Sequence, residues 1–217
     1  KTHSAQQQAI EVALAQGLTI ITGGPGTGKT FTLVRILMAL LQQNPQLKVA
    51  LAAPTGKAAA RMQEALRNSL EQTPLAAELL SVLPNTAFTL HRLLGMGHGT
   101  QAKFNQQQPL AYDLVIVDEA SMIDLRMATQ LLSAIAPTAR LILLGDANQL
   151  AAVEAGAVLA EISKAQRLTQ SSVQLTESQR FGSDSGIGQL ATAICDGDVE
   201  KTHELLKRGL PDVLYHP

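Results

Sequence analysis

Apolar residues in this chain form two kinds of run, and the two kinds alternate along the sequence. Short continuous runs predict buried strands at residues 18–22, 47–53, 113–118 and 140–145. Apolar residues at helical spacing predict helices at residues 4–16, 30–43, 56–70 and near 124–135, with a turn or two at 89–95. Almost wholly apolar strands that alternate with helices favour a parallel sheet with helices on both faces, which is an α/β fold.

The remaining segments carry weaker patterns. Ser4 is the predicted N-cap of the first helix, and Gly17 marks its predicted end. The glycine- and glutamine-rich stretch 95–111 predicts an exposed, mobile loop. The patterns also predict short helices at residues 74–83, near 155–164, near 185–196 and near 199–208. They predict one further short strand at residues 173–175.

The composition is that of a folded domain without disulfides. Hydrophobic residues make up 46% of the 217 residues, which is enough for a core and excludes wholesale disorder. Cys195 is the single cysteine, and the five histidines lack the spacing of a zinc site. No apolar run reaches the roughly 20 residues of a membrane helix, and no signal peptide opens the chain. We therefore expect a cytoplasmic protein without a membrane partner, and the start at Lys1 indicates a piece of a longer chain.

The charge is close to balanced. The 17 Lys and Arg residues against 18 Asp and Glu residues give a net charge of −1. A strongly basic field, which attracts nucleic acid over a whole surface, is therefore absent, and any nucleic-acid site must be local. Charged residues are only 16% of the chain, which favours extensive burial or faces covered by partner domains.

The stretch GGPGTGKT, residues 23–30, matches the phosphate-binding pattern G-x-x-x-x-G-K-[ST] between a predicted strand and a predicted helix. Glycines let successive backbone N–H groups curve around a phosphate, and the helix N-terminus adds positive potential. Lys29 is expected to reach the β- and γ-phosphates of ATP, and Thr30 to bind Mg²⁺. A flexible turn without a ligand is the alternative, and the strand-to-helix context disfavours it. The predicted nucleotide-binding residues of the loop are Gly24, Pro25, Gly26, Thr27, Gly28, Lys29 and Thr30.

Two adjacent carboxylates come after another predicted strand. Asp118 and Glu119 come directly after the four apolar residues 114–117, so we expect them at the tip of a buried strand beside the strand that precedes the glycine loop. There Asp118 would hold Mg²⁺ and Glu119 would polarise the attacking water as a general base. Ordinary surface charge is the alternative interpretation.

Two weaker candidates come after later strands. Gln149 in GDANQL could sense a γ-phosphate, and Arg180 in LTESQRF could donate a bidentate pair of hydrogen bonds to it. From the residues alone, a solvent-facing glutamine and a surface salt bridge explain them better.

Six segments in this order resemble superfamily-one DNA helicases, and within them the RecD family of exodeoxyribonuclease V (RecBCD) subunits. The segments are GGPGTGKT, LAAPTGKAAARM, TLHRLLG, VDEASMID, LLGDANQLAAVEAGAVL and RFGSDSGIGQLA. They run through most of the chain, and together they are far more specific than the glycine loop alone. The resemblance implies a RecA-like P-loop NTPase fold. It places a first motor domain at residues 1–180 and a helical segment, 181–217, at the start of the following region.

The resemblance also assigns roles to residues that the patterns leave open. It makes Gln149 the residue that couples ATP to DNA, and Arg180 an arginine that contacts the γ-phosphate. A glutamine before the glycine loop reads adenine in this family, and the family's spacing selects Gln6, with Gln7 as the alternative. Single-stranded DNA would contact a first set of residues, Pro54, Thr55, Gly56 and Lys57. A second set, Thr89, His91 and Arg92, matches the next DNA-contact region, although an ordinary capped helix explains it nearly as well.

The function implied by the resemblance is ATP- and Mg²⁺-dependent movement along single-stranded DNA, 5′ to 3′, in double-strand-break repair with RecB- and RecC-like subunits. A standalone RecD-like helicase shares the same motifs. A P-loop kinase or other small-molecule NTPase is a rival, and the segment APTGKAAARM argues against it. A nucleotide-binding interaction module without catalysis is another, and the presence of Glu119 argues against that. The family's later motifs and its amino-terminal domain are absent from these residues, and 164–173 is shorter than the resemblance leads us to expect.

Overall fold

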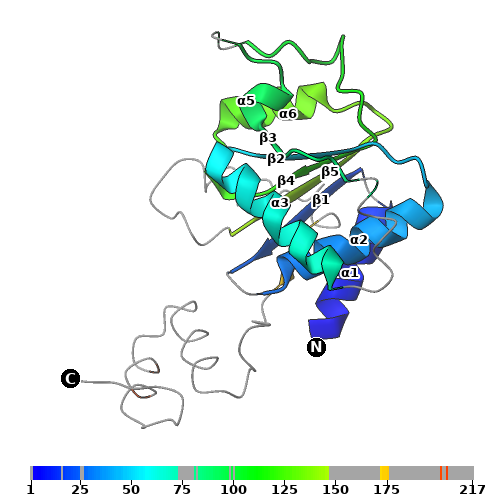
Figure 1. Cartoon of the computed structure of the whole chain (residues 1–217). Coiled ribbons are helices and arrows are strands. Elements are labelled where there is room, and N and C mark those ends of the chain that lie inside the picture. Colours follow the sequence, from blue (N-terminus) through cyan, green and yellow to red (C-terminus); the bar gives the residue numbers. More distant parts are fainter. Residues whose placement is uncertain are drawn as a thin grey trace.

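The computed structural model describes residues 2–15, 17–24, 27–72, 81, 83–97, 99, 101–146, 172–175, 201 and 204. Within these residues the strands form one parallel sheet in the order β3-β2-β4-β5-β1-β6, with helices on both faces (Figure 1). The strands are β1 (Leu18–Gly23), β2 (Val49–Ala53), β3 (Phe88–Thr89), β4 (Leu114–Val117), β5 (Arg140–Gly145) and β6 (Ser172–Leu175). The helices are α1 (Thr2–Ala15), α2 (Lys29–Gln43), α3 (Gly56–Glu71), α5 (Leu90–Leu93), α6 (Leu125–Ala134) and the 3₁₀ turn η1 (Ala120–Met122).

The predicted α/β fold is confirmed, and the predicted strands and helices that lie in the described residues are present with small shifts at their ends. The predicted cap is wrong, because α1 begins at Thr2 and Ser4 lies inside its first turn. The strand predicted at 173–175 is confirmed as β6. The helices predicted near 155–164 and 185–196, and nearly all of those at 74–83 and near 199–208, lie outside the described residues. No described helix has the length and hydropathy needed to cross a membrane.

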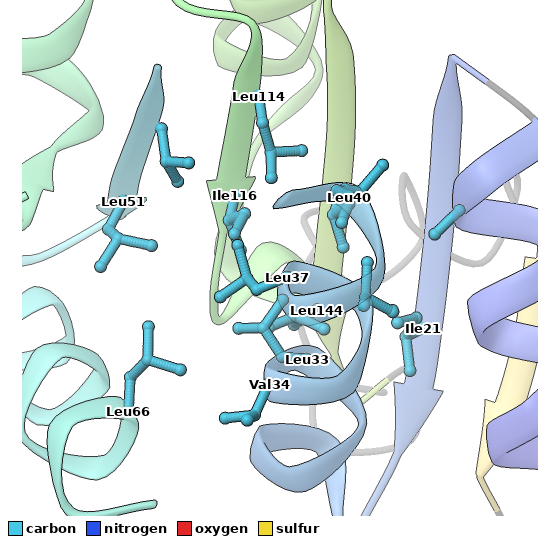
Figure 2. Close-up of a cluster of buried hydrophobic side chains, with 14 of the residues drawn as sticks. Ile21, Leu33, Val34, Leu37, Leu40, Leu51, Leu66, Leu114, Ile116 and Leu144 are labelled. Atoms are coloured by element: carbon cyan, nitrogen blue, oxygen red, sulfur yellow. The ribbon is translucent and has the colours of Figure 1, made fainter. Parts of the chain in front are cut away.

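One face of the sheet packs against α1, α2 and α3. Every second residue of each strand contributes its side chain to this face, because successive side chains of a strand point to opposite faces. Figure 2 shows Leu37 of α2 beside Ile116 of β4, and Leu33, Leu40 and Leu114 belong to the same buried cluster. All five side chains are at most 3% exposed, so the apolar stripe of α2 fixes this helix over the centre of the sheet.

The opposite face packs against α5, η1 and α6. The strand side chains on this face include Ala50, Val115 and Leu143, and Leu90 of α5 and Leu131 of α6 pack over them. Both faces of the central strands are therefore buried, which explains why these strands are apolar at consecutive positions.

The stretch 95–111 is irregular but anchored. The N–H groups of Lys103 and Phe104 both donate to the carbonyl of Leu94, at 2.9 and 3.2 Å, and Leu110 donates to the last residue of α6 at 2.8 Å. Leu110 is buried in the core below α6, whereas residues 105–109 are exposed. The prediction of an exposed loop is thus correct for the glutamines and wrong for the anchored residues, because Phe104 and Leu110 supply apolar surface that the core buries.

The order of the strands corrects one expectation. The sequence favours β4, which ends before Asp118, as the neighbour of β1, which enters the glycine loop. Instead β5 lies between them and pairs with both strands. β1 has β5 on one side and β6 on the other, so no edge of β1 is left for β4. Parallel strands all end at the same edge of the sheet, and Asp118 therefore still lies near the loop.

Candidate functional site

The glycine loop leads from β1 into α2 without a side-chain cap. Gly28 takes the N-cap position with φ 84°, a left-handed conformation that glycine adopts without strain. Thr32 secures the first turn, because its backbone N–H and its hydroxyl both donate to the carbonyl of Gly28 at 2.9 Å. The first N–H groups of α2 have no side-chain acceptor at the cap and remain available to an anion.

Lys29 lies folded over the loop. Its ammonium donates to the carbonyls of Gly23 at 2.5 Å and Gly24 at 2.9 Å, and the Thr27 hydroxyl donates to the Gly24 carbonyl at 2.8 Å. Burial lowers the pKa of Lys29, while the carboxylates of Asp118 and Asp146 oppose that shift. The ammonium therefore lies within electrostatic reach of two carboxylates, one at the end of β4 and one after β5.

Asp118 is half-buried at the carboxyl end of β4. Burial raises the pKa of Asp118, whereas a hydrogen bond from the Glu119 backbone N–H and the charge of Lys29 lower it. The N–H to Oδ1 distance is 2.8 Å. A desolvated carboxylate next to a lysine is suited to receive a divalent cation, because the cation restores the charge compensation that water would provide.

Glu119 has an unusual backbone. It is the one described non-glycine residue with a positive φ, at 51° with ψ 39°. This left-handed conformation costs an ordinary side chain about 1–2 kcal/mol. Strain of this kind is concentrated at functional sites, where the surrounding structure fixes the direction of a side chain. The 3₁₀ turn η1 begins at the next residue, and Met122 N–H donates to the Glu119 carbonyl at 3.0 Å.

Asp146 is a site residue that the sequence patterns did not single out. It comes directly after β5, the strand between β1 and β4, and its Oδ2 lies 3.9 Å from the position that a Cβ on Gly24 would occupy. A signal is present in the sequence, because an acidic residue directly after a buried strand has the same pattern as Asp118. The pattern alone does not select it, because the sequence does not reveal that β5 adjoins the glycine loop.

The two candidate glutamines before the loop differ sharply in environment. Gln6 is only 3% exposed, and its Nε2 has no hydrogen-bond partner. Gln7 is exposed and donates to Glu11 one turn later, at 3.4 Å. A buried amide without a partner is costly, so Gln6 is suited to donate to a ligand, whereas Gln7 makes an ordinary surface pair.

The donors present fit a magnesium nucleotide. Thr30, in the first turn of α2, and Asp118 supply hydroxyl and carboxylate oxygens, which are the ligand types that Mg²⁺ accepts. Among the described residues no three His, Cys, Asp or Glu side chains gather as a metal cluster.

A second set of candidate residues lies at the ends of β2 and β3. Thr55 caps α3 by accepting from Ala58 N–H at 3.2 Å, and Thr89 caps α5 by accepting from Arg92 N–H at 3.2 Å. The strands pair in parallel, and a Cβ on Gly56 would lie 4.0 Å from the Thr89 methyl group. The two threonine caps are therefore neighbours, and each hydroxyl can still donate its proton.

The charged members of this set face solvent. Lys57, His91 and Arg92 are exposed, and Pro54 is half-buried. The Arg92 guanidinium lies 5.6 Å from the centre of the Phe88 ring, within the range of a cation–π contact. The capped helix that is the alternative explanation of Thr89, His91 and Arg92 is present as α5, so their contact with DNA stays a prediction. This helix places a local patch of positive charge at the edge of the sheet.

The structure thus gathers the candidate residues into two separate groups. One group surrounds Lys29 and Asp118, and the other surrounds Thr55 and Thr89. Four predicted site residues lie outside the described residues: Pro25, Gly26, Gln149 and Arg180.

The sequence profile of the AAA domain family matches residues 6–155. The RecBCD enzyme subunit RecD of Mycolicibacterium smegmatis is 46% identical over 94% of this chain and 37% of the relative, and that of Haemophilus influenzae is 40% identical over 92% and 36%. The ATP-dependent RecD2 DNA helicase of Deinococcus radiodurans is 36% identical over 89% of this chain and 24% of the relative. The chain therefore spans little more than a third of the length of these RecD relatives. Their identity to this chain confirms the resemblance that the motifs indicate.

Among solved structures, Bacteroides Pif1 bound to single-stranded DNA matches with a TM-score of 0.56 and 21% identity, over 96% of this chain and 49% of that one. Pif1 helicase from Candida albicans matches with a TM-score of 0.53 and 21% identity, over 98% and 48%. The likeness shows a RecA-like P-loop fold.

Proposed function

Because the chain belongs to the AAA domain family and is related to the RecD helicases, we propose that it is the first, ATP-hydrolysing motor domain of a DNA helicase that moves 5′ to 3′ along single-stranded DNA. One observation carries the proposal. An uncapped glycine loop, a lysine folded onto it and a desolvated carboxylate converge at one edge of the sheet. This arrangement binds a triphosphate and its cation, and two threonine caps lie at the ends of neighbouring strands.

For ATP, the loop N–H groups bind the β-phosphate and Lys29 leaves its two loop carbonyls to contact the β- and γ-phosphates. Thr30 and Asp118 would hold Mg²⁺, which would neutralise phosphate charge. Glu119, held in its left-handed conformation, orients and deprotonates the attacking water. Gln149 and Arg180 complete the proposal, with Gln149 coupling hydrolysis to DNA and Arg180 donating to the γ-phosphate.

Adenine recognition falls to Gln6 in this proposal. Its buried Nε2 lacks an acceptor, and adenine offers ring nitrogens that accept hydrogen bonds. Gln7 is less suitable, since it is exposed and already donates to Glu11.

Single-stranded DNA contacts the second set of residues. Lys57 and Arg92 supply charge, and the Thr55 and Thr89 hydroxyls supply donors that suit phosphate oxygens. The chain contains no Trp, four Phe and two Tyr, too few for an extended base-stacking surface. We therefore propose contact mainly through the DNA backbone.

The setting is cytoplasmic double-strand-break repair with RecB- and RecC-like subunits, because the relatives named RecD are named as subunits of the RecBCD enzyme. The similarity to the helicase named RecD2 supports a second candidate, a standalone helicase. Association with RecB- and RecC-like chains on purification separates the two.

The proposal is tested by the ATP hydrolysis rate of the whole protein with and without oligo(dT). A rate that rises at least tenfold with DNA supports it. A rate unaffected by DNA, combined with phosphorylation of a small molecule, would assign the site to a P-loop kinase instead.

A further inference from the structure

The side chain of Gln63, in the middle of α3, binds a neighbouring segment with both ends of its amide. Its Nε2 donates to the carbonyl of Asn85, and its Oε1 accepts from the N–H of Ala87 at 3.1 Å. A primary amide that donates to one backbone group and accepts from another two residues later fixes both the position and the direction of that segment.

The segment needs such support. Residues 85–87 lead directly into β3, which is only two residues long and pairs with β2 at the edge of the described sheet. Two residues form too few ladder hydrogen bonds to hold an edge strand firmly. Ala87 in this segment also packs on Ala53, on Ala58 and Ala59 of α3, and on the core between the sheet and α1–α3.

The segment leads into the second half of the proposed DNA contact. Ala87 lies two residues before Thr89, which caps α5, and α5 carries His91 and Arg92. The first half, Thr55 to Lys57, begins the same helix that carries Gln63. Gln63 therefore ties the helix that starts at one set of DNA-contact residues to the segment that ends at the other.

We propose that Gln63 is a positioning residue for single-stranded DNA, which sets the relative placement of the Thr55–Lys57 and Thr89–Arg92 contacts through residues 85–87. The inference rests on the proposed function and deepens it. Gln63 does not contact DNA in this proposal. It acts because a strand bound at two places is bound tightly only when both sets of donors keep their spacing.

A purely structural role for Gln63 gives a different expectation. Loss of the amide would then lower the free energy of unfolding and weaken nucleotide and DNA binding together. A positioning role predicts a selective loss, because the glycine loop and Asp118 are held by β1, β4 and α2, whereas the Gln63 amide donates to and accepts from residues 85–87.

The test uses the whole protein, with fluorescence anisotropy of labelled oligo(dT) for DNA and of labelled ATP with Mg²⁺ for nucleotide. Gln63→Ala removes both hydrogen bonds and keeps a strong helix former. Gln63→Glu keeps the acceptor for Ala87 and loses the donor to Asn85. Gln72→Ala, at the exposed C-cap of α3, makes the same chemical change away from the segment.

We expect Gln63→Ala to weaken oligo(dT) binding by about five- to thirtyfold, with Gln63→Glu between it and the wild type. The nucleotide affinity of Gln63→Ala should stay within twofold of the wild type. Gln72→Ala should bind both oligo(dT) and nucleotide within twofold of the wild type. In an Arg92→Ala, Thr89→Ala background, Gln63→Ala should add less than twofold, since the contacts that it positions are already gone.

Wild-type DNA affinity for Gln63→Ala would overturn the inference and leave the proposed function intact. An equal loss of nucleotide and DNA binding would overturn it in favour of a structural role. A wild-type protein that does not bind oligo(dT) would overturn the proposed function and this inference with it.

Discussion

The carboxylate of Asp118 accepts a 2.8 Å hydrogen bond from the backbone N–H of Glu119, the residue whose φ is 51°. The proposed metal-binding carboxylate and the backbone of the proposed general base are thus joined directly. The hydrogen bond favours the ionised form of Asp118 against its burial, and it fixes the peptide from which the Glu119 side chain projects. Binding of the cation and placement of the base are therefore linked through one peptide group.

Glu119→Gln separates binding from chemistry. The variant keeps the shape and a hydrogen-bonding group but loses the base, so we expect turnover to fall by about 10²–10⁴. Nucleotide affinity should stay within threefold, because Asp118 is unchanged. Steady-state hydrolysis and equilibrium binding of labelled ATP measure the two quantities. A parallel collapse of affinity would instead identify Glu119 as a metal ligand.

Glu119→Asn tests the backbone conformation. Asparagine tolerates the left-handed region better than glutamate, so the free energy of unfolding should rise by up to about 1 kcal/mol although turnover is lost. Urea unfolding of the metal-free protein, compared with Glu119→Gln as the control, gives the difference. A variant less stable than Glu119→Gln would show that the positive φ is not a source of strain.

Lys29→Ala should abolish ATP hydrolysis. No other described side chain donates to the carbonyls of both Gly23 and Gly24, and none supplies a positive charge at the β- and γ-phosphates. Folding should survive, because the variant removes a desolvated ammonium from the edge of the sheet. Hydrolysis within threefold of the wild type, measured on the whole protein, would refute the assignment of the loop.

The metal-free protein should lose stability as the pH rises past the ordinary aspartate value. Burial raises the folded-state pKa of Asp118 above 3.8, so the native state retains a proton that the unfolded state has released. The free energy of unfolding therefore decreases between pH 3.8 and the raised pKa and stays lower above it. Asp118→Asn removes this contribution.

Urea midpoints of the wild type and Asp118→Asn, recorded in chelator from pH 4 to pH 8, isolate this effect. The wild-type midpoint minus the variant midpoint should fall with rising pH and then level off. If that difference increased with pH, Asp118 would be stabilised as an ion, and the dominance of burial would be wrong.

Lys57→Ala should weaken oligo(dT) binding about equally for all base sequences and reduce the salt dependence of binding by about one unit of slope. Thr55→Ala should also weaken binding without changing base preference, since its hydroxyl contacts phosphate. Binding to oligo(dT), oligo(dA) and mixed sequences at several salt concentrations measures both effects. A variant with altered base preference would contradict contact through the backbone.

The 217-residue chain alone should bind magnesium nucleotide weakly and unwind no DNA. In two-domain motors a further arginine from the second domain reaches the γ-phosphate, and such an arginine is worth about 10³–10⁵ in rate. The chain spans little more than a third of the length of the RecD relatives, and the resemblance places the second motor domain outside these residues. A strand-displacement assay compares ATP-dependent unwinding by the 217-residue chain with that by the whole protein. Unwinding by the chain alone would refute this two-domain layout.

The sequence by itself determined the local parts of this protein. GGPGTGKT specifies the loop and the uncapped start of α2, since a left-handed Gly28 and a lysine one residue later are properties of a short segment. The apolar run before Asp118 places that carboxylate at a strand tip in the same way. Such features depend on neighbours in the chain, and residue spacing reveals them.

The tertiary structure decided everything that depends on which distant segments meet. The alternation of strands and helices predicts a parallel sheet but not the neighbour of each strand, so the position of β5 between β1 and β4, and with it Asp146 near Gly24, was not predictable. Burial distinguishes Gln6 from Gln7, although the two are identical and adjacent in sequence. The amide of Gln63 meets Ala87 across 24 residues, and no local pattern encodes a contact at that separation.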